Sequence, residues 1–296
     1  MKASNSPRLK ANFDKRTYPG WIAAPGMLIY IVIFAIPTFA SFYFSLTRWD
    51  LKTAEFTGLE NFITFFSMSN TKSALINTVI YAFSTCTFKV AVGLLLAQYL
   101  CSRIRSREYL KTIYFLPTLL GNVAVAVAFE SILAKDGLLN QCLVSMGFEA
   151  IKWITDSKYA LFSAIVVDIW KGIGVSLVIY VAGISAISRD YFEAAVIDGA
   201  TPWQSFRKIT LPLMVPTINS VLTLSLIAGL RNYELVYSLT GGGPGYSTEL
   251  LGSAVYKLFS RGSYGLATAG YVIMFVIVSL IVFPINSFVA KREAEL

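Results

Sequence analysis

The sequence predicts an all-α polytopic membrane protein with six transmembrane helices. Only 14% of its 296 residues are charged and 55% are hydrophobic, whereas a soluble domain contains about 25% charged residues. The apolar residues also occur in long blocks, and about 20 mostly apolar residues cross a bilayer as a helix. The mean hydropathy of +0.62 agrees with this pattern. We therefore expect helices that span a membrane rather than one soluble core.

Six apolar blocks are long enough to form these helices. The first and the last contain 25 residues each without a charge. The second contains one charge, Lys89, and the fourth contains Asp168 and Lys171. The third and the fifth are shorter and uncharged. In chain order, the blocks comprise residues 22–46, 74–101, 113–129, 160–187, 213–230 and 266–290.

These blocks divide the chain into four parts. The first block is too long for the apolar core of a signal peptide, which has about 7–15 residues, so we expect it to be retained. The parts are a cytoplasmic N-terminal tail (1–20), a first transmembrane helix with its outside loop (21–73), a five-helix transmembrane domain with a loop at 188–212 (74–290), and a cytoplasmic C-terminal tail (291–296).

Lysine and arginine predict how the chain is oriented. The two tails and the loops 102–111 and 188–212 contain 14 of these residues, and the three loops on the opposite side contain 8. Because basic residues favour the cytoplasmic side, both termini and the loop 188–212 are predicted to be cytoplasmic. Basic residues at membrane borders also meet anionic lipid. The net charge of +8 therefore predicts lipid contacts and no nucleic-acid partner.

Catalytic and metal-binding patterns are missing. The sequence contains no histidine, which removes the usual general base and metal ligand. It contains no P-loop motif for ATP either. We therefore predict a chain that is not an enzyme and holds no cofactor or metal. Cys86, Cys101 and Cys142 lack a spacing typical of a pair and are predicted to be free packing residues.

The loop 188–212 has a pattern typical of two short helices joined by a tight turn. Residues 193–198 favour a helix that begins with an acidic residue, where the helix dipole stabilises negative charge. Gly199 permits a chain reversal. Thr201 before Pro202 is typical of the cap and first position of a second helix. Two helices at an angle are expected to form a rigid projection suited to a groove in another protein.

The fixed positions of this loop identify a resemblance. They read Glu-Ala-Ala, three residues, Gly, nine residues and Ile-x-Leu-Pro. This pattern resembles the cytoplasmic coupling loop of ABC importer permeases, and it implies a type I ABC importer permease fold. The alternative is an ordinary loop between two membrane spans. The residues that the resemblance assigns to ATPase coupling are Glu193, Ala194, Ala195, Asp198, Gly199, Ile209, Leu211 and Pro212.

Three further motifs are similar to those of carbohydrate ABC permeases of the maltose, glycerol-phosphate and multiple-sugar type. They are 239–244 with Thr248, 170–172, and 136–140. The resemblance is to the larger permease of such systems, without its two additional N-terminal spans and inserted outside domain. It implies a second homologous permease, two ABC ATPase subunits that bind ATP and Mg²⁺, an extracytoplasmic solute-binding protein, and a carbohydrate substrate. It also implies a bacterial cytoplasmic membrane.

Two stripes of residues are predicted to line the substrate path. Ionisable residues within a membrane usually face a cavity or a partner. Asp168 and Lys171 are three residues apart in a helix and are therefore expected to be able to pair. Positions matching both stripes contact sugar in the maltose-type permease. The first stripe comprises Asp168, Lys171, Gly172 and Val175, and the second comprises Ser225, Ala228, Gly229 and Asn232. The alternative is a structural ion pair and a stripe of small residues that packs helices.

Two other functions remain open on sequence alone. An ion-gradient-driven secondary transporter is one, although such carriers commonly contain inverted repeats and broken helices and we expect neither here. An ABC importer permease for a solute other than a sugar is the second. A membrane-embedded enzyme is disfavoured because acid–base residues are scarce.

Overall fold

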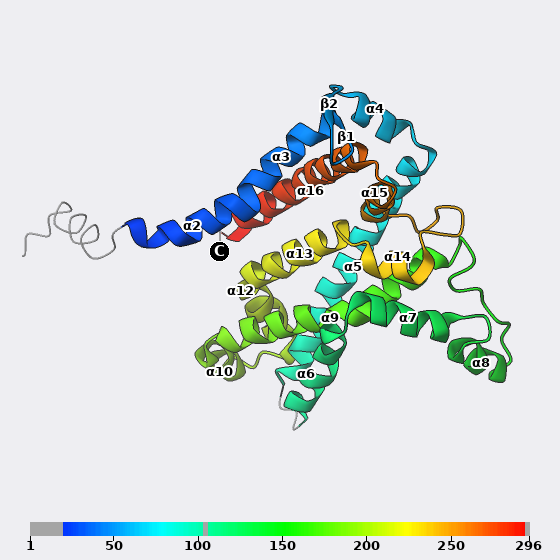
Figure 1. Ribbon diagram of the computed structural model, residues 1–296. Coiled ribbons are helices and arrows are strands. Elements are labelled where there is room, and N and C mark those ends of the chain that lie inside the picture. The colour runs from blue at the N-terminus through cyan, green and yellow to red at the C-terminus, as the bar shows by residue number, and fades with distance from the viewer. Residues whose placement is uncertain (1–19, 103–105, 294–296) are drawn as a thin grey trace, which may run out of the picture.

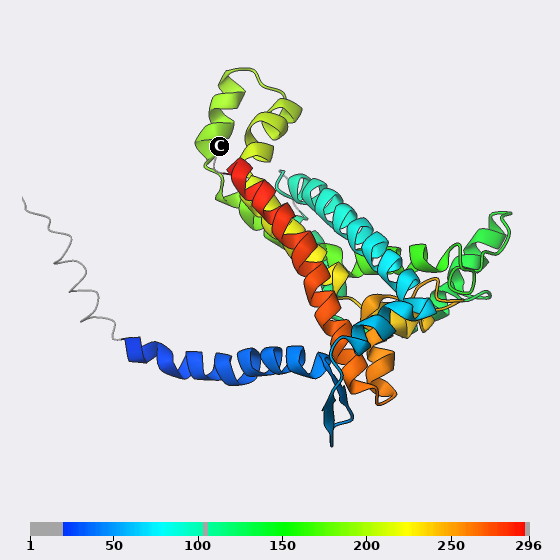
Figure 2. The ribbon, with the colours of Figure 1, turned by 90° about the horizontal axis from the view of Figure 1, so that it is seen from above.

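The computed structural model describes residues 20–102 and 106–293, and nearly all of the regular structure in them is helical. The helices spread outward from a packed centre instead of forming a sphere (Figures 1 and 2). A short antiparallel hairpin, in which Thr47 pairs with Phe56, was not predicted. It is the only sheet among the described residues, and its strands are β1 (Thr47–Trp49) and β2 (Ala54–Phe56).

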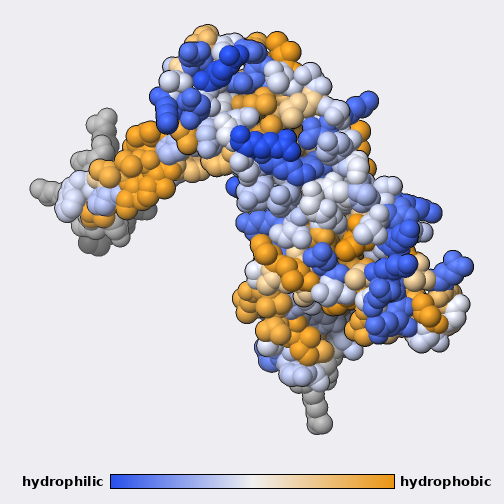
Figure 3. All heavy atoms as spheres, turned by 45° about the vertical axis from the view of Figure 1, so that its right-hand side comes forward, coloured by the Kyte–Doolittle hydropathy of each residue, from blue (hydrophilic) through white to orange (hydrophobic). Residues whose placement is uncertain are grey.

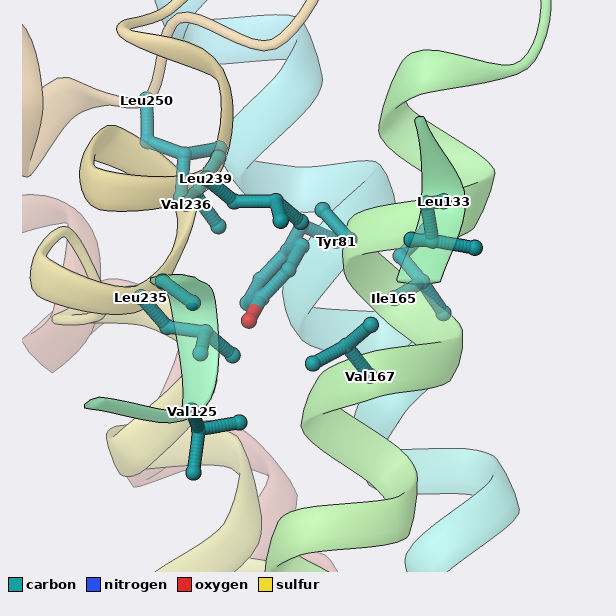
Figure 4. Close-up of a cluster of buried hydrophobic side chains, with 11 residues drawn as sticks. Tyr81, Val125, Leu133, Ile165, Val167, Leu235, Val236, Leu239 and Leu250 are labelled. Atoms are coloured by element: carbon teal, nitrogen blue, oxygen red, sulfur yellow. The ribbon is translucent and has the colours of Figure 1, made fainter. Parts of the chain in front are cut away.

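The centre of the molecule consists of three long helices packed against one another. They are α5 (Ser69–Leu100), α9 (Ala160–Ala186) and α13 (Val215–Leu230). The buried ring of Tyr81 on α5 lies among aliphatic side chains of α9 and α14 (Glu234–Thr240) (Figure 4). This packing fixes the spacing of the three helices and leaves room for a cavity between them.

The first predicted span is a single long apolar rod that projects from the body. Its most apolar window has no buried residue, and Figure 3 shows apolar side chains along it. Its last part packs against the C-terminal helix α16 (Tyr264–Glu293). The exposed apolar surface is what a lipid environment requires. The rod comprises η1 (Gly20–Ala23), α2 (Ala24–Tyr30), η2 (Ile31–Ala35) and α3 (Ile36–Ser45).

Four helices among the described residues are long and apolar enough to cross a membrane, and the number is six if each of two bent pairs is one span. The expectation of unbroken helices was wrong. The third predicted span contains a break at Leu120–Gly121, where both residues are extended. Pro117 lies in a tight 3₁₀ turn just before it. The two halves, Arg107–Leu119 and Asn122–Ser145, meet at 99°.

The second bent pair leads into the fifth span. Pro202–Leu213 meets Val215–Leu230 at 68°. The helices around both breaks are α6 (Arg107–Phe115), η3 (Leu116–Leu119), α7 (Asn122–Leu133), α8 (Leu138–Ser145), α10 (Arg189–Ile197), α11 (Pro202–Ser205), η4 (Phe206–Thr210) and α12 (Leu211–Leu213).

Short helices also occupy the predicted outside loops. They are α4 (Glu60–Ser67), α8, α14 and α15 (Leu251–Ser260). Glu249, just before α15, is fully buried, and it forms an ion pair with Lys257 and accepts from the Ser253 hydroxyl. The amide of Asn77 on α5 donates to two carbonyls of the same loop, those of Tyr246 and Glu249. These bonds anchor the glycine-rich loop 241–245 to the transmembrane core.

Cys86, Cys101 and Cys142 are free. The predicted packing role fits Cys86, which is buried, but is wrong for Cys142, which is exposed. Nearly all of the predicted N-terminal tail and the last three residues of the C-terminal tail lie outside the described residues.

Candidate functional site

The loop 188–212, here called the coupling loop, begins with helix α10. The Ser188 hydroxyl caps this helix by accepting from the backbone amide of Asp190 at 3.3 Å. The helix ends at a Schellman motif, in which the Ala200 amide donates to the Ala195 carbonyl at 2.9 Å. Gly199 has a φ of +72° at this point, a conformation that side chains disfavour. The predicted glycine reversal is present. The helix begins at Arg189 instead of Glu193, so the expectation that Glu193 starts it was wrong, and Asp190 is the acidic residue of its first turn.

The second half of the coupling loop begins at a complete capping box. The Thr201 hydroxyl accepts from the Gln204 amide at 3.3 Å, and the Gln204 side chain accepts from the Thr201 amide at 2.7 Å. Pro202 occupies the first helical position, as predicted. The helix is longer than expected, since it continues through η4 and α12 as far as Leu213. It ends at the 68° bend that joins the loop to the fifth span.

The coupling loop exposes large apolar side chains. Ile197 is 86% exposed and Val196 is 74% exposed. Trp203 and Tyr191 are exposed as well. The loop projects from one end of the molecule beside the C-terminal end of α16 (Figure 2). Because exposed apolar groups beyond the six predicted spans are typical of interaction surfaces, this end of the chain is suited to bind another protein.

The predicted substrate residues meet at a cavity of about 550 Å³ between the transmembrane helices. Seven of the eight lie in its wall, and Gly229 does not. The cavity is also lined by η3, α7 and the start of α14. We call it the central cavity. Its lining residues are Lys89, Thr118, Asn122, Asp168, Lys171, Gly172, Val175, Ser176, Ile179, Val221, Leu224, Ser225, Ala228, Arg231, Asn232, Tyr233 and Glu234.

The expected pairing of Asp168 with Lys171 was wrong, because Asp168 binds a residue of another helix. The Lys89 Nζ donates to the Asp168 Oδ2 at 2.6 Å, and both side chains are at least 90% buried. The Asn232 amide lies 3.4 Å from the other carboxylate oxygen and donates to the Tyr81 hydroxyl at 3.0 Å. This network links α5, α9 and the end of α13.

Two glycines explain how the helices approach one another here. A Cβ on Gly172 would lie 2.7 Å from the Nζ of Lys89, so the glycine leaves the path by which Lys89 reaches Asp168. A Cβ on Gly229 would lie 2.8 Å from the Cα of Ala82. Gly229 is buried in the contact between α13 and α5, and its lack of a side chain permits that contact. It therefore faces the neighbouring helix rather than the cavity.

Sequence reasoning missed several polar groups of the central cavity. Thr118 and Asn122 lie on the two sides of the break in the third span, and Ser176 lies on α9. The proline and glycine around that break were the available signal. Trp170, the first residue of the 170–172 motif, packs against Phe129 at a centroid distance of 5.0 Å and is not part of the lining.

Only some of the charged side chains that line the central cavity are paired with one another. Asp168 is neutralised by Lys89, and the Asn122 amide donates to the Glu234 carboxylate at 2.8 Å. Within the described residues, Lys171 and Arg231 form no ion pair. Among the described residues, no three His, Cys, Asp or Glu side chains are grouped so that they could hold a metal ion. The cavity thus offers hydrogen-bonding groups to a polar solute.

Apolar membrane-spanning helices around a polar cavity, with a rigid loop outside the bilayer, define a membrane transport subunit. Residues 11–294 match the family model described as "Binding-protein-dependent transport system inner membrane component". The chain therefore belongs to this family of ABC transporter permeases. Permeases of the family are the non-catalytic transmembrane component of importers that work with a binding protein.

The similarity to known proteins extends over nearly the full length of the chain. The trehalose/maltose transport system permease protein of Thermococcus litoralis is 30% identical over 257 residues, which cover 86% of this chain and 87% of that protein. The lactose transport system permease protein of Rhizobium radiobacter is 29% identical, with full coverage of both chains. A solved bacterial ABC transporter that imports the acidic polysaccharide alginate matches with a TM-score of 0.82 and 25% identity, covering 96% of this chain and 99% of that one.

Proposed function

We propose that this chain is a permease subunit that moves a carbohydrate, in particular an oligosaccharide, into the cell by alternating access. Relatives named for trehalose/maltose, lactose and alginate support a sugar. The observation that supports it most directly is the central cavity, because its volume of about 550 Å³ is typical of small-molecule sites and its wall contains both charged and amide groups.

The coupling loop receives the motion of separate ATPase subunits. Its Schellman motif and capping box make it rigid, and Ile197 and Val196 are exposed for docking. The continuous helix from Pro202 to Leu213 leads from this surface to α13, which lines the central cavity. Closure of the ATPases is therefore expected to shift one wall of the cavity relative to the others.

The orientation and the partner subunits are those expected of such an importer. Both termini and the coupling loop lie in the cytoplasm of a bacterial cell, and the chain pairs with a second homologous permease. Two ABC ATPase subunits bind ATP and Mg²⁺ below, and an extracytoplasmic solute-binding protein delivers the sugar from outside. The long apolar rod formed by the first span, with no buried residue in its most apolar window, is covered in this assembly by lipid or the companion permease.

Reconstitution tests the energy source. The chain, its companion permease, the ATPases and the loaded binding protein are placed in liposomes, and uptake of labelled sugar is measured with ATP or with an ion gradient alone. We expect uptake only with ATP, and none when the ATPase carries a substituted P-loop lysine. Broken helices also occur in ion-driven carriers. Uptake driven by the ion gradient without ATP would therefore overturn the proposal.

A further inference from the structure

The lining of the central cavity contains more positive charge than its own acidic residues balance. Lys89 is bound to Asp168, and Glu234 accepts from Asn122. Lys171, Arg231 and Glu234 remain without an ion pair in the described residues. The charged lining residues therefore sum to one positive charge, and the two free cations both belong to that lining.

Lys171 is the more informative of the two cations. It lies in the middle of α9, a membrane-spanning helix, and its side chain is partly buried. Ionisable groups at such a depth are costly and usually face a partner or a substrate path. Arg231 has a simpler explanation, since it caps the C-terminal end of α13, where the helix dipole favours a cation. The helix dipole offers no such explanation for Lys171.

The two cations without an ion pair give the cavity wall a surplus of charged hydrogen-bond donors. A lysine ammonium has three donors and an arginine guanidinium has five, and neither accepts. Of the two carboxylates in the wall, Asp168 already binds Lys89 and lies near the Asn232 amide, and Glu234 accepts from the Asn122 amide. A neutral sugar needs both donors and acceptors for its hydroxyls. An anionic group accepts only, and a guanidinium matches it with two parallel hydrogen bonds.

We propose that the central cavity selects carbohydrates that carry an anionic group, a carboxylate, sulfate or phosphate, and that Lys171 and Arg231 bind that group. The inference rests on the proposed function, since it names the substrate class of the same cavity. The competing explanation is that an acidic residue of the companion permease neutralises both cations in the assembled transporter.

The test uses the complete reconstituted transporter with its own binding protein. The probes are uronate-containing oligosaccharides, their carboxyl-reduced neutral counterparts of equal length, and sulfated or phosphorylated oligosaccharides. Initial ATP-driven uptake is measured for each, together with the affinity of the isolated binding protein for the same probe. We expect an anionic class to be transported at least about tenfold faster than the neutral class after correction for binding-protein affinity. The preferred anionic class identifies the group.

Variants separate recognition from folding. Lys171→Gln is expected to lower the preference for the anionic class by about ten- to hundredfold, the effect of one hydrogen bond to a charged group, and Arg231→Gln is expected to lower it too. Lys171→Arg, which keeps the charge, should restore most of the preference. Lys52→Gln removes an exposed cation in the β1–β2 hairpin and should change nothing.

Two outcomes overturn the inference while leaving the proposed function intact. One is equal or faster uptake of the neutral sugars by the unaltered transporter. The other is an equal loss of neutral and anionic uptake in Lys171→Gln, which indicates pairing with the companion permease. ATP-dependent uptake of no carbohydrate at all contradicts the proposed function instead.

Discussion

The buried pair of Lys89 and Asp168 makes a sharp prediction about stability. Asp168→Leu leaves the Lys89 ammonium in a site where its side chain is only 8% exposed, with no carboxylate to balance it. It also removes the acceptor next to Asn232. Removing one member of a buried pair costs about 3–5 kcal/mol of stability. Since both residues line the central cavity instead of a closed core, we expect the lower end, about 3 kcal/mol.

The double variant Lys89→Met/Asp168→Leu should be more stable than either single variant. It removes both charges together, and apolar replacement of a buried pair is often neutral or stabilising. Methionine follows the same path past Gly172 that the lysine stem takes. Thermal unfolding of the purified transporter in lipid nanodiscs measures the four members of this double-mutant cycle.

The control identifies the partner of Asp168. Asp168→Leu/Lys171→Leu should be no more stable than Asp168→Leu, because Lys171 does not contact the carboxylate. Rescue by Lys171→Leu, or failure of Lys89→Met to rescue, would refute the pairing and with it the geometry of the central cavity.

Three further predictions concern the coupling loop and the packing of α13. Gly199→Trp should abolish ATP-driven uptake but leave membrane insertion intact, because a side chain at φ +72° costs about 1–2 kcal/mol and distorts the loop; normal uptake would remove the loop from coupling. Ile197→Asp should weaken co-purification of the ATPase subunits without changing the binding protein's affinity for sugar, and an unchanged ATPase yield would place docking elsewhere. Gly229→Leu should lower thermal stability by about 1–3 kcal/mol through overpacking against Ala82, whereas Ala228→Leu, which faces the central cavity, should lower uptake with less effect on stability.

The coupling loop was predictable because its structure depends on local chemistry. Thr201 and Gln204 are three residues apart, and a capping box needs only that spacing. The turn at Gly199 depends only on the helix that directly precedes it in the sequence. The apolar blocks were predictable for the same reason, since each depends on a run of neighbouring residues.

The central cavity was predictable only in part because contacts between helices depend on their rotation and depth. The spacing of Asp168 and Lys171 placed them on one face, and the preference for a partner on the same helix followed from that. The actual partner, Lys89, is 79 positions away, and no local pattern specifies how α5 is turned. Gly229 belongs to a stripe of small residues that includes Ser225 and Ala228, yet its side faces α5. The break after Pro117 was hidden by an uncharged apolar block that looked continuous.

Accessibility of the central cavity from each side of the membrane tests the central claim of alternating access. The three native cysteines form no disulfide, so they can be replaced, and Val175→Cys then places a single thiol in the cavity wall, where Val175 is 40% exposed. Labelling by a membrane-impermeant maleimide is measured from each side, with and without a non-hydrolysable ATP analogue and loaded binding protein. We predict reaction from the cytoplasmic side without nucleotide and from the outside once ATP analogue and binding protein are present. A thiol that reacts from the same side in both conditions would contradict the claim that this chain alternates access under the control of its ATPase partners.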